Sequence, residues 1–204
     1  MLQSAFMDGM MDEYLIRARR LHESVVVVDT HCDTTQRLMD DAFDLGERHQ
    51  AGHVDIPRLR AGGIDAVFLA VFAPPPLEPG MGRTAAQAQI ERIQDTIGRH
   101  NTCLSCARTA AEVRKAKDDG RIAIIVAIEG GHLIEDSLDV LREYHSLGAA
   151  YLTLTHAGHT SWADSSGVHE PLGPLHNGLT SFGRGVVREL NRLGMMVDVS
   201  HVSD

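Results

Sequence analysis

The sequence has no long hydrophobic run, and none of its apolar stretches approaches the roughly 18 residues that a membrane-spanning helix needs. Its first segment, residues 1–24, mixes acidic and basic residues with apolar ones. That segment therefore lacks the basic start and apolar centre of a secretory signal, and we expect it to form an amphipathic helix. These absences predict a cytoplasmic protein with no membrane partner.

Clustered positive charge and paired cysteines are scarce as well. The formal net charge is −9, whereas phosphate binding needs grouped lysines and arginines, so we expect no nucleic-acid partner. The three cysteines, Cys32, Cys103 and Cys106, are an odd number that suits a reducing compartment. Cys103 and Cys106 match a C-x-x-C pattern, but a structural zinc site needs about four ligands and no second pair exists. We interpret them as ordinary thiols.

A short β-branched run followed by a helical pattern recurs along the chain. Such continuous apolar runs are typical of strands that are covered on both faces. Five runs predict strands, at residues 25–29, 64–72, 122–128, 150–155 and 195–199. Helical patterns lie between them at 84–100, 109–119, 137–147 and 182–193. The last two patterns are followed by Gly148 and Gly194, which are expected C-terminal caps.

Strands that alternate with helices indicate parallel βαβ units, in either a doubly wound open sheet or a (β/α)8 barrel. Neither a G-x-G-x-x-G nor a G-x-x-x-x-G-K-[ST] phosphate motif follows any predicted strand. The barrel is therefore favoured. We expect residues 1–204 to form a single, incomplete α/β catalytic domain of the TIM-barrel type. In this domain 1–24 is a helix and 25–204 supplies about five of the eight strands.

Metal-ligating residue types follow four of the five predicted strands, at the edge where barrel enzymes assemble their active sites. Alone, a histidine here is more often a hydrogen-bonded core residue, and a lone carboxylate can sit at a helix start. Four such coincidences at one edge favour a shared function. Histidine and carboxylate ligands select zinc or a similar ion, and a carboxylate can bridge two ions about 3.5–4 Å apart. The residues are His31 with Asp33, Glu129, His156 and His201.

Four long segments of the chain resemble the membrane dipeptidase (renal dipeptidase) family in its bacterial, unanchored form, from about residue 25 to the last residue. The segments are VVDTHCDT, HVDIPRLRAGGIDAVFLAVF, AIEGGHLIEDSLDVLREYHSLGAAYLTLTHAGHTSWADSS and GLTSFGRGVVRELNRLGMMVDVSHVSD. The resemblance implies a zinc-dependent barrel of the metal-dependent hydrolase superfamily that hydrolyses dipeptides, and a homodimer when full length.

The resemblance also implies a role for each candidate residue. His31 and Asp33 match ligands of a first zinc ion, Glu129 matches the carboxylate that bridges two ions, and His201 matches a ligand of the second. His156 matches the histidine that contacts the substrate and stabilises the tetrahedral intermediate. The implied mechanism is attack on the peptide carbonyl by a hydroxide that bridges the two ions, so Glu129 and His156 are the expected catalytic residues.

The chain departs from the family pattern in two places. After His156 the chain has Ala157, Gly158 and His159 where the family usually has asparagine or cysteine, and the extra histidine could alter the pocket or face solvent. No residue matches the family's second histidine on the second zinc, its substrate-binding arginine or its late acidic residue, so we expect the N-terminal part of a longer enzyme. The alternatives are a non-catalytic or incomplete fragment, or a related amidohydrolase that acts on another amide or a lactone. The latter typically carries H-x-H rather than H-x-D on the first strand.

Overall fold

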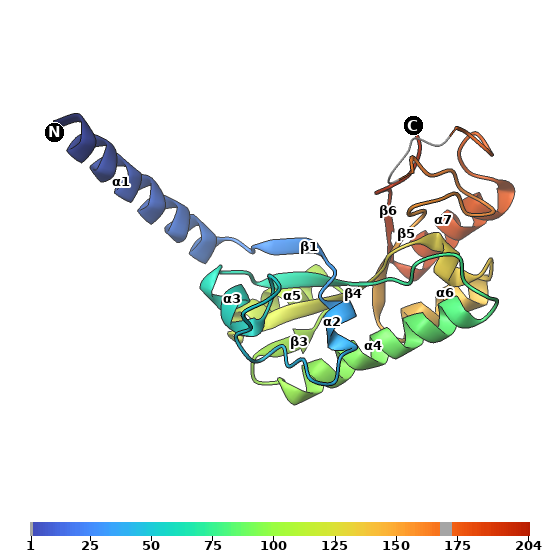
Figure 1. Cartoon of the computed structure of the whole chain (residues 1–204), viewed down its shortest axis with the longest axis horizontal. Helices are drawn as coiled ribbons and strands as arrows, with labels where there is room; N and C mark the ends of the chain where they lie inside the picture. The colour runs from blue at the N-terminus through green and yellow to red at the C-terminus, as the bar shows by residue number, and fades with distance from the viewer. Residues whose placement is uncertain (1, 168–172) are drawn as a thin grey trace.

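The fold is a curved parallel sheet with helices packed against it (Figure 1). The computed structural model describes residues 2–167 and 173–204, with side chains from Asp12 onward. The main strands lie side by side in the order β1, β2, β4, β5, β6. They span Val28–Cys32, Ala66–Val71, Ile122–Ile128, Ala149–Thr153 and Met196–Asp198. This path confirms the predicted parallel half-barrel. A further short strand, β3 (Leu104–Cys106), was not predicted and pairs with the first residues of β4.

One helix precedes these strands and the others lie between them. They are α1 (Leu2–Ser24), α2 (Thr35–Leu38), α3 (Ile56–Ala61), α4 (Met81–Arg99), α5 (Ala110–Asp118), the 3-10 helix η1 (Gly131–Ile134), α6 (Leu138–Ser146) and α7 (Ser181–Leu193). The side chains of Ser137 and Thr180 accept hydrogen bonds from the first turns of α6 and α7, as N-caps do. Gly194 ends α7 in the left-handed conformation, with φ of 73°, as the sequence predicts.

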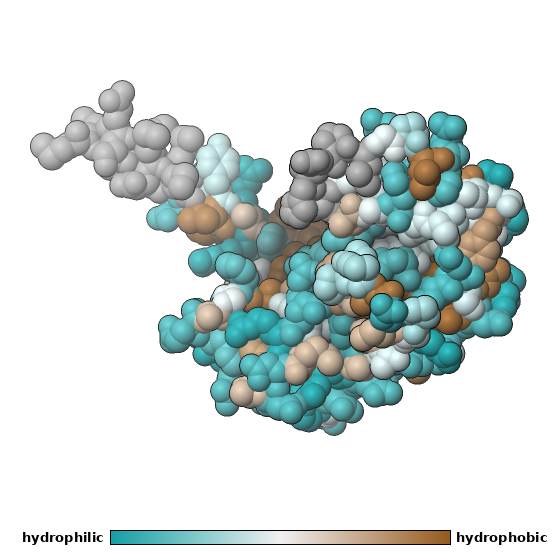
Figure 2. All heavy atoms as spheres, turned by 45° about the vertical axis from the view of Figure 1, so that its right-hand side comes forward, coloured by the Kyte–Doolittle hydropathy of each residue, from teal (hydrophilic) through white to brown (hydrophobic). Residues whose placement is uncertain are grey.

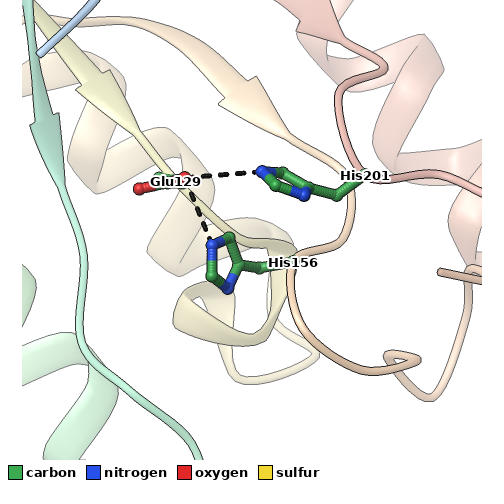
Figure 3. A group of neighbouring side chains, drawn as sticks. All are labelled: Glu129, His156 and His201. Atoms are coloured by element: carbon green, nitrogen blue, oxygen red, sulfur yellow. Dashed lines mark ion pairs between the residues drawn. The ribbon is translucent and has the colours of Figure 1, made fainter. Parts of the chain in front are cut away.

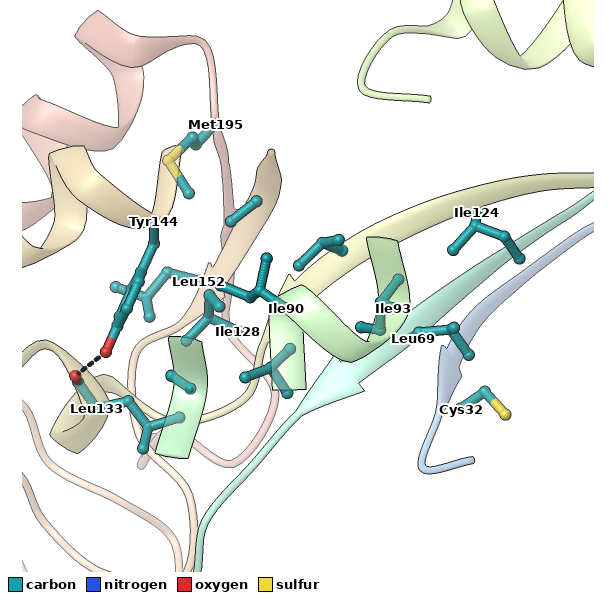
Figure 4. Packing of buried hydrophobic residues seen from close by; sticks show 14 of the residues in the cluster. Cys32, Leu69, Ile90, Ile93, Ile124, Ile128, Leu133, Tyr144, Leu152 and Met195 are labelled. Atoms are coloured by element: carbon teal, nitrogen blue, oxygen red, sulfur yellow. Dashed lines mark hydrogen bonds between the residues drawn. The ribbon is translucent and has the colours of Figure 1, made fainter. Parts of the chain in front are cut away.

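The outer face of the sheet carries the larger hydrophobic core. Alternate residues of β2 and β4, such as Leu69 and Ile124, point outward and pack against α4, η1 and α6 (Figure 4). In that core Ile90 and Ile93 come from α4, and Tyr144 of α6 donates a 2.7 Å hydrogen bond to the carbonyl of Leu133. The outer face is therefore covered by helices.

The inner face of the sheet forms a second, smaller core of mostly small side chains. Ala66 and Phe68 of β2 face inward with Ala123, Ile125 and Ala127 of β4 and Tyr151 of β5. Ala116 of α5 packs onto this face. Because side chains alternate along a strand, Glu129 follows Ala127 onto the inner side.

The first and last strands of the path each pair with one neighbour in the described part of the chain. The predicted first strand, 25–29, begins later than expected, because Val28 is the first residue that pairs with β2, opposite Ala66. Val25 and Val26 before it are exposed. Helix α1 extends away from the sheet, and Figure 2 shows apolar atoms near its base and in the hollow beside it. Among the described helices, none combines the length and apolar character required to cross a bilayer.

Candidate metal centre

Glu129 lies at the centre of the site. It directly follows β4, its amide donates a 2.9 Å hydrogen bond to the carbonyl of Val71, and it is only 5% exposed. The two glycines after it let the chain turn sharply. Gly130 has φ of 109°, and a Cβ on Gly131 would collide with the carbonyl of Leu154 and the ring of Trp162. The turn therefore places the buried carboxylate of Glu129 close to the residues that follow β5.

His31 and Asp33 form the first group of donors with Glu129. The Nε2 atom of His31 lies 3.3 Å from Asp33 Oδ1 and 3.5 Å from Glu129 Oε1. The pairing of β1 with β2 is irregular between Asp29 and Cys32, as at a β-bulge. Thr30 and His31 consequently line the same inner cavity although they are adjacent in sequence. The structure thus brings His31 and Asp33 together at the end of β1.

His156 and His201 form the second group with the same carboxylate (Figure 3). His156 follows β5, and its Nε2 lies 3.3 Å from Glu129 Oε1. His201 follows β6, and its Nε2 lies 3.7 Å from that oxygen. The two imidazole rings are 4.6 Å apart, and the ring of Phe72 lies 4.6 Å from His156 on another side. All five residues singled out in the sequence therefore meet at one edge of the sheet.

The spacing of these donor atoms fits metal ligation. Ligand nitrogens about 2.0–2.1 Å from a tetrahedral zinc ion are separated from one another by about 3.3 Å. The contacts with Glu129 Oε1 range from 3.3 to 3.7 Å. In each group the donor atoms lie within 4.8 Å of one another, and Glu129 belongs to both groups. Each group therefore has donors at the spacing that a metal ion requires, and Glu129 is common to both.

The electrostatics of the site favour added positive charge. Burial raises the pKa of Glu129; His31 opposes that shift and Asp33 reinforces it. Burial also lowers the pKa of His156, and the neighbouring His201 lowers it further. A buried carboxylate beside imidazole nitrogens offers lone pairs that a cation stabilises.

Three polar side chains in and after β5, those of Tyr151, Thr153 and Thr155, were not singled out in the sequence. Tyr151 contacts His31, with its hydroxyl 3.1 Å from Nδ1. Asp198 accepts a 2.6 Å hydrogen bond from Thr153 Oγ1, and Thr155 Oγ1 donates to the carbonyl of His201. The available signal was the two-residue spacing of Tyr151, Thr153 and Thr155, which puts polar groups on one side of an otherwise apolar strand.

His159 does not face solvent freely. Its Nδ1 accepts a 3.0 Å hydrogen bond from the amide of Ser165, and its side chain is 19% exposed. It lines a cavity with His132 and Glu135, separate from the one lined by His31, Glu129 and His201. The three cysteines are free thiols, and no candidate metal group in the described residues includes them.

Comparisons with known proteins agree with this geometry. The family model described as membrane dipeptidase (peptidase family M19) matches residues 15–204. The chain is similar to dipeptidase verJ of Clonostachys rogersoniana, with 33% identity over 96% of this chain and 53% of the relative. Dipeptidase aclJ of Aspergillus oryzae is 40% identical over 74% of this chain and 37% of the relative.

A solved structure supports the fold. It is a metallopeptidase from Rhodobacter sphaeroides, liganded with a phosphinate mimic of the dipeptide L-Ala-D-Ala. The similarity has a TM-score of 0.79 at 28% identity and covers 88% of this chain and 60% of that one. The chain spans about half the length or less of the curated relatives named above. Because the family model matches nearly the whole length of this chain, the chain belongs to the membrane dipeptidase family, peptidase family M19.

Proposed function

We propose that this protein is a metal-dependent dipeptidase that hydrolyses the peptide bond of a dipeptide with two zinc ions bridged by Glu129. The observation that carries the proposal is the convergence of three imidazoles on one buried carboxylate oxygen, from separate strands. Relatives named as dipeptidases, and a similar metallopeptidase bound to a dipeptide mimic, support the substrate class.

The roles of the first ligands follow from their grouping. His31 and Asp33 would hold one ion, and His201 would hold the other, each together with Glu129. The ions, when bound, supply Lewis-acid polarisation of the scissile carbonyl and lower the pKa of the attacking water. Burial of Glu129 strengthens the attraction between its carboxylate and a bound cation, because charges interact more strongly away from bulk water.

His156 is assigned to the substrate rather than to an ion. Its Nδ1 is buried and has no hydrogen-bond partner among the described residues. An unpaired buried N–H is rarer in proteins than an unpaired acceptor, so the ring carries its proton on Nε2. That atom faces Glu129 and the site. His156 would therefore donate a hydrogen bond to the negative charge that develops on the substrate carbonyl oxygen.

The proposal has two further parts, an oligomeric state and a location. Homodimer formation is supported by the family resemblance. A cytoplasmic location is supported by the odd number of cysteines, which suits a reducing compartment.

The test combines a substrate panel with Glu129→Gln. We expect the wild-type protein to hydrolyse L,L- or L,D-dipeptides in preference to lactones, and Glu129→Gln to abolish turnover and reduce bound zinc. Glu91→Gln, at an exposed carboxylate on α4, is the matched control and should retain both. Full activity and normal zinc content in Glu129→Gln would refute the bridge, and turnover of lactones alone would favour the amidohydrolase alternative.

A further inference from the structure

Tyr151 lies beneath the metal centre on the inner face of β5. It is 6% exposed, and its hydroxyl is 3.1 Å from Nδ1 of His31, a residue 120 positions earlier in the chain. Both residues line the cavity that also contains Glu129 and His201. The contact joins the first and the fourth strands of the main path across the inside of the half-barrel.

The two ring nitrogens of His31 point to different partners. Nε2 faces Asp33 and Glu129, whereas Nδ1 faces the Tyr151 hydroxyl. A histidine nitrogen that binds a metal uses its lone pair, so the other nitrogen of the ring carries the proton. The Tyr151 oxygen is therefore positioned to accept a hydrogen bond from Nδ1–H.

The Tyr151 ring is itself held in place. It stacks on Phe68 of β2 with ring centres 5.5 Å apart and planes 18° apart. A hydroxyl held by this stacking can fix both the tautomer and the direction of the imidazole it contacts.

We propose that Tyr151 is a positioning residue of the metal centre, whose hydroxyl accepts the Nδ1–H of His31 and aims Nε2 at the ion. This inference rests on the proposed metal-dependent function. It adds a residue to that site and assigns the proton of His31 to Nδ1.

The test is Tyr151→Phe, which removes the hydroxyl and keeps the ring that stacks on Phe68. Metal-free protein is titrated with Zn²⁺ in competition with a chromophoric chelator. We expect one zinc equivalent to bind about 10–100-fold more weakly, the usual effect of losing a hydrogen-bond partner of a ligand. The weakened equivalent should be the one that persists in a His201→Ala variant.

Tyr144→Phe is the matched control, because it also removes a buried tyrosine hydroxyl. That hydroxyl bonds the carbonyl of Leu133 in the outer core and contacts no candidate ligand. We expect Tyr144→Phe to lower the thermal midpoint and to leave zinc affinity at the wild-type value. A purely structural role for Tyr151 would give the same result as this control.

The outcomes separate the inference from the function on which it rests. If the wild-type protein binds no zinc, the proposed function fails and the inference fails with it. If the wild-type binds zinc and Tyr151→Phe binds it equally well, only the inference is overturned. A second measurement needs no substitution at Tyr151: nitrogen-15 spectra of the zinc-bound wild type should show His31 protonated at Nδ1. A ring protonated at Nε2 would overturn the inference whether or not Tyr151→Phe folds.

Discussion

At the scale of single residues, His201 has a conformation that its neighbours must hold. Its φ is +65°, a left-handed value that costs roughly 1–2 kcal/mol in a residue with a side chain. The carbonyl of His201 accepts hydrogen bonds from Thr155 Oγ1 at 2.9 Å and from the amide of Ser166 at 3.0 Å. Asp198 fixes the preceding turn by accepting from the amide of Ser200. The proposed ligand His201 thus lies in a strained turn that surrounding hydrogen bonds stabilise.

Thr155→Val tests this support, because it removes the hydroxyl and nearly preserves the shape of the side chain. We expect a loss of about 1 kcal/mol in the free energy of unfolding, the typical net value of one hydrogen bond. We also expect weaker zinc binding, since His201 is then less firmly aimed. Urea unfolding and zinc titration measure the two effects.

Thr96→Val provides the comparison for Thr155→Val. Thr96 is equally buried and its hydroxyl bonds the carbonyl of Arg92 within α4, away from the site. It should lose stability while keeping zinc affinity. Equal zinc affinity in both variants would show that the bond from Thr155 does not orient His201.

At the scale of elements, the turn between β4 and η1 sets how closely two strand ends approach. Gly131 packs against the carbonyl of Leu154 and the buried ring of Trp162, leaving no room for a Cβ atom. This close approach brings the carboxylate of Glu129 to the imidazole of His156. The glycine is therefore required by packing rather than by phosphate binding.

Gly131→Ala should destabilise the protein by about 1–3 kcal/mol, as overpacking of a tight core typically does. Gly185→Ala is the control, because a Cβ at that position of α7 meets no atom within 4 Å. Alanine there should stabilise by up to about 1 kcal/mol, since glycine is the weaker helix former. Thermal or urea unfolding of both variants decides the matter, and equal stability of Gly131→Ala and wild type would contradict the packing argument.

The elements also show what local sequence can and cannot predict. The apolar run at 122–128 predicts β4 with its observed bounds, because both faces of that strand are covered. The short elements α2, α3 and β3 were missed, since a few residues contain too little periodicity. Helix α4 begins at Met81 rather than at the predicted position 84. There Glu135 accepts hydrogen bonds from the amides of Gly80 and Arg83, a cap more than 50 positions away in sequence.

At the scale of the whole molecule, the candidate site depends on nearly the entire sheet. His31 belongs to the first strand of the path and His201 follows the last, and both reach Glu129 between them. The sequence could predict this meeting because parallel strands share one edge. It could not predict that Tyr151 contacts His31, since that contact depends on the bulge in β1 and the curvature of the sheet.

Carboxyl groups with lowered pKa values, spread over the whole molecule, should make its stability sensitive to acid. Hydrogen bonds in the folded protein lower the pKa of seven carboxyl groups. These are the groups of Asp44, Asp55, Glu112, Asp119, Asp164, Glu189 and Asp198. Glu189 on α7 is 8% exposed and bonds Arg192 and, across to α6, Arg142. These hydrogen bonds, with Arg192 first, lower the pKa of Glu189 to about 2. Its carboxylate therefore joins two helices only while it stays ionised.

In the unfolded chain Glu189 takes up a proton at about pH 4.3, the value of an unperturbed glutamate. In the folded chain it does so only at about pH 2. The stability that Glu189 contributes is therefore complete above the unfolded pKa and lost as pH falls through this window. We expect the urea midpoint of the wild type to decline from about pH 4.5 to 2.

Glu189→Gln should be less stable at neutral pH and show a flatter decline. Asp139→Asn removes another partner of Arg142, but that carboxylate is 89% exposed, so it should retain the wild-type slope. Parallel slopes for wild type and Glu189→Gln would mean that this pair does not contribute to the acid response.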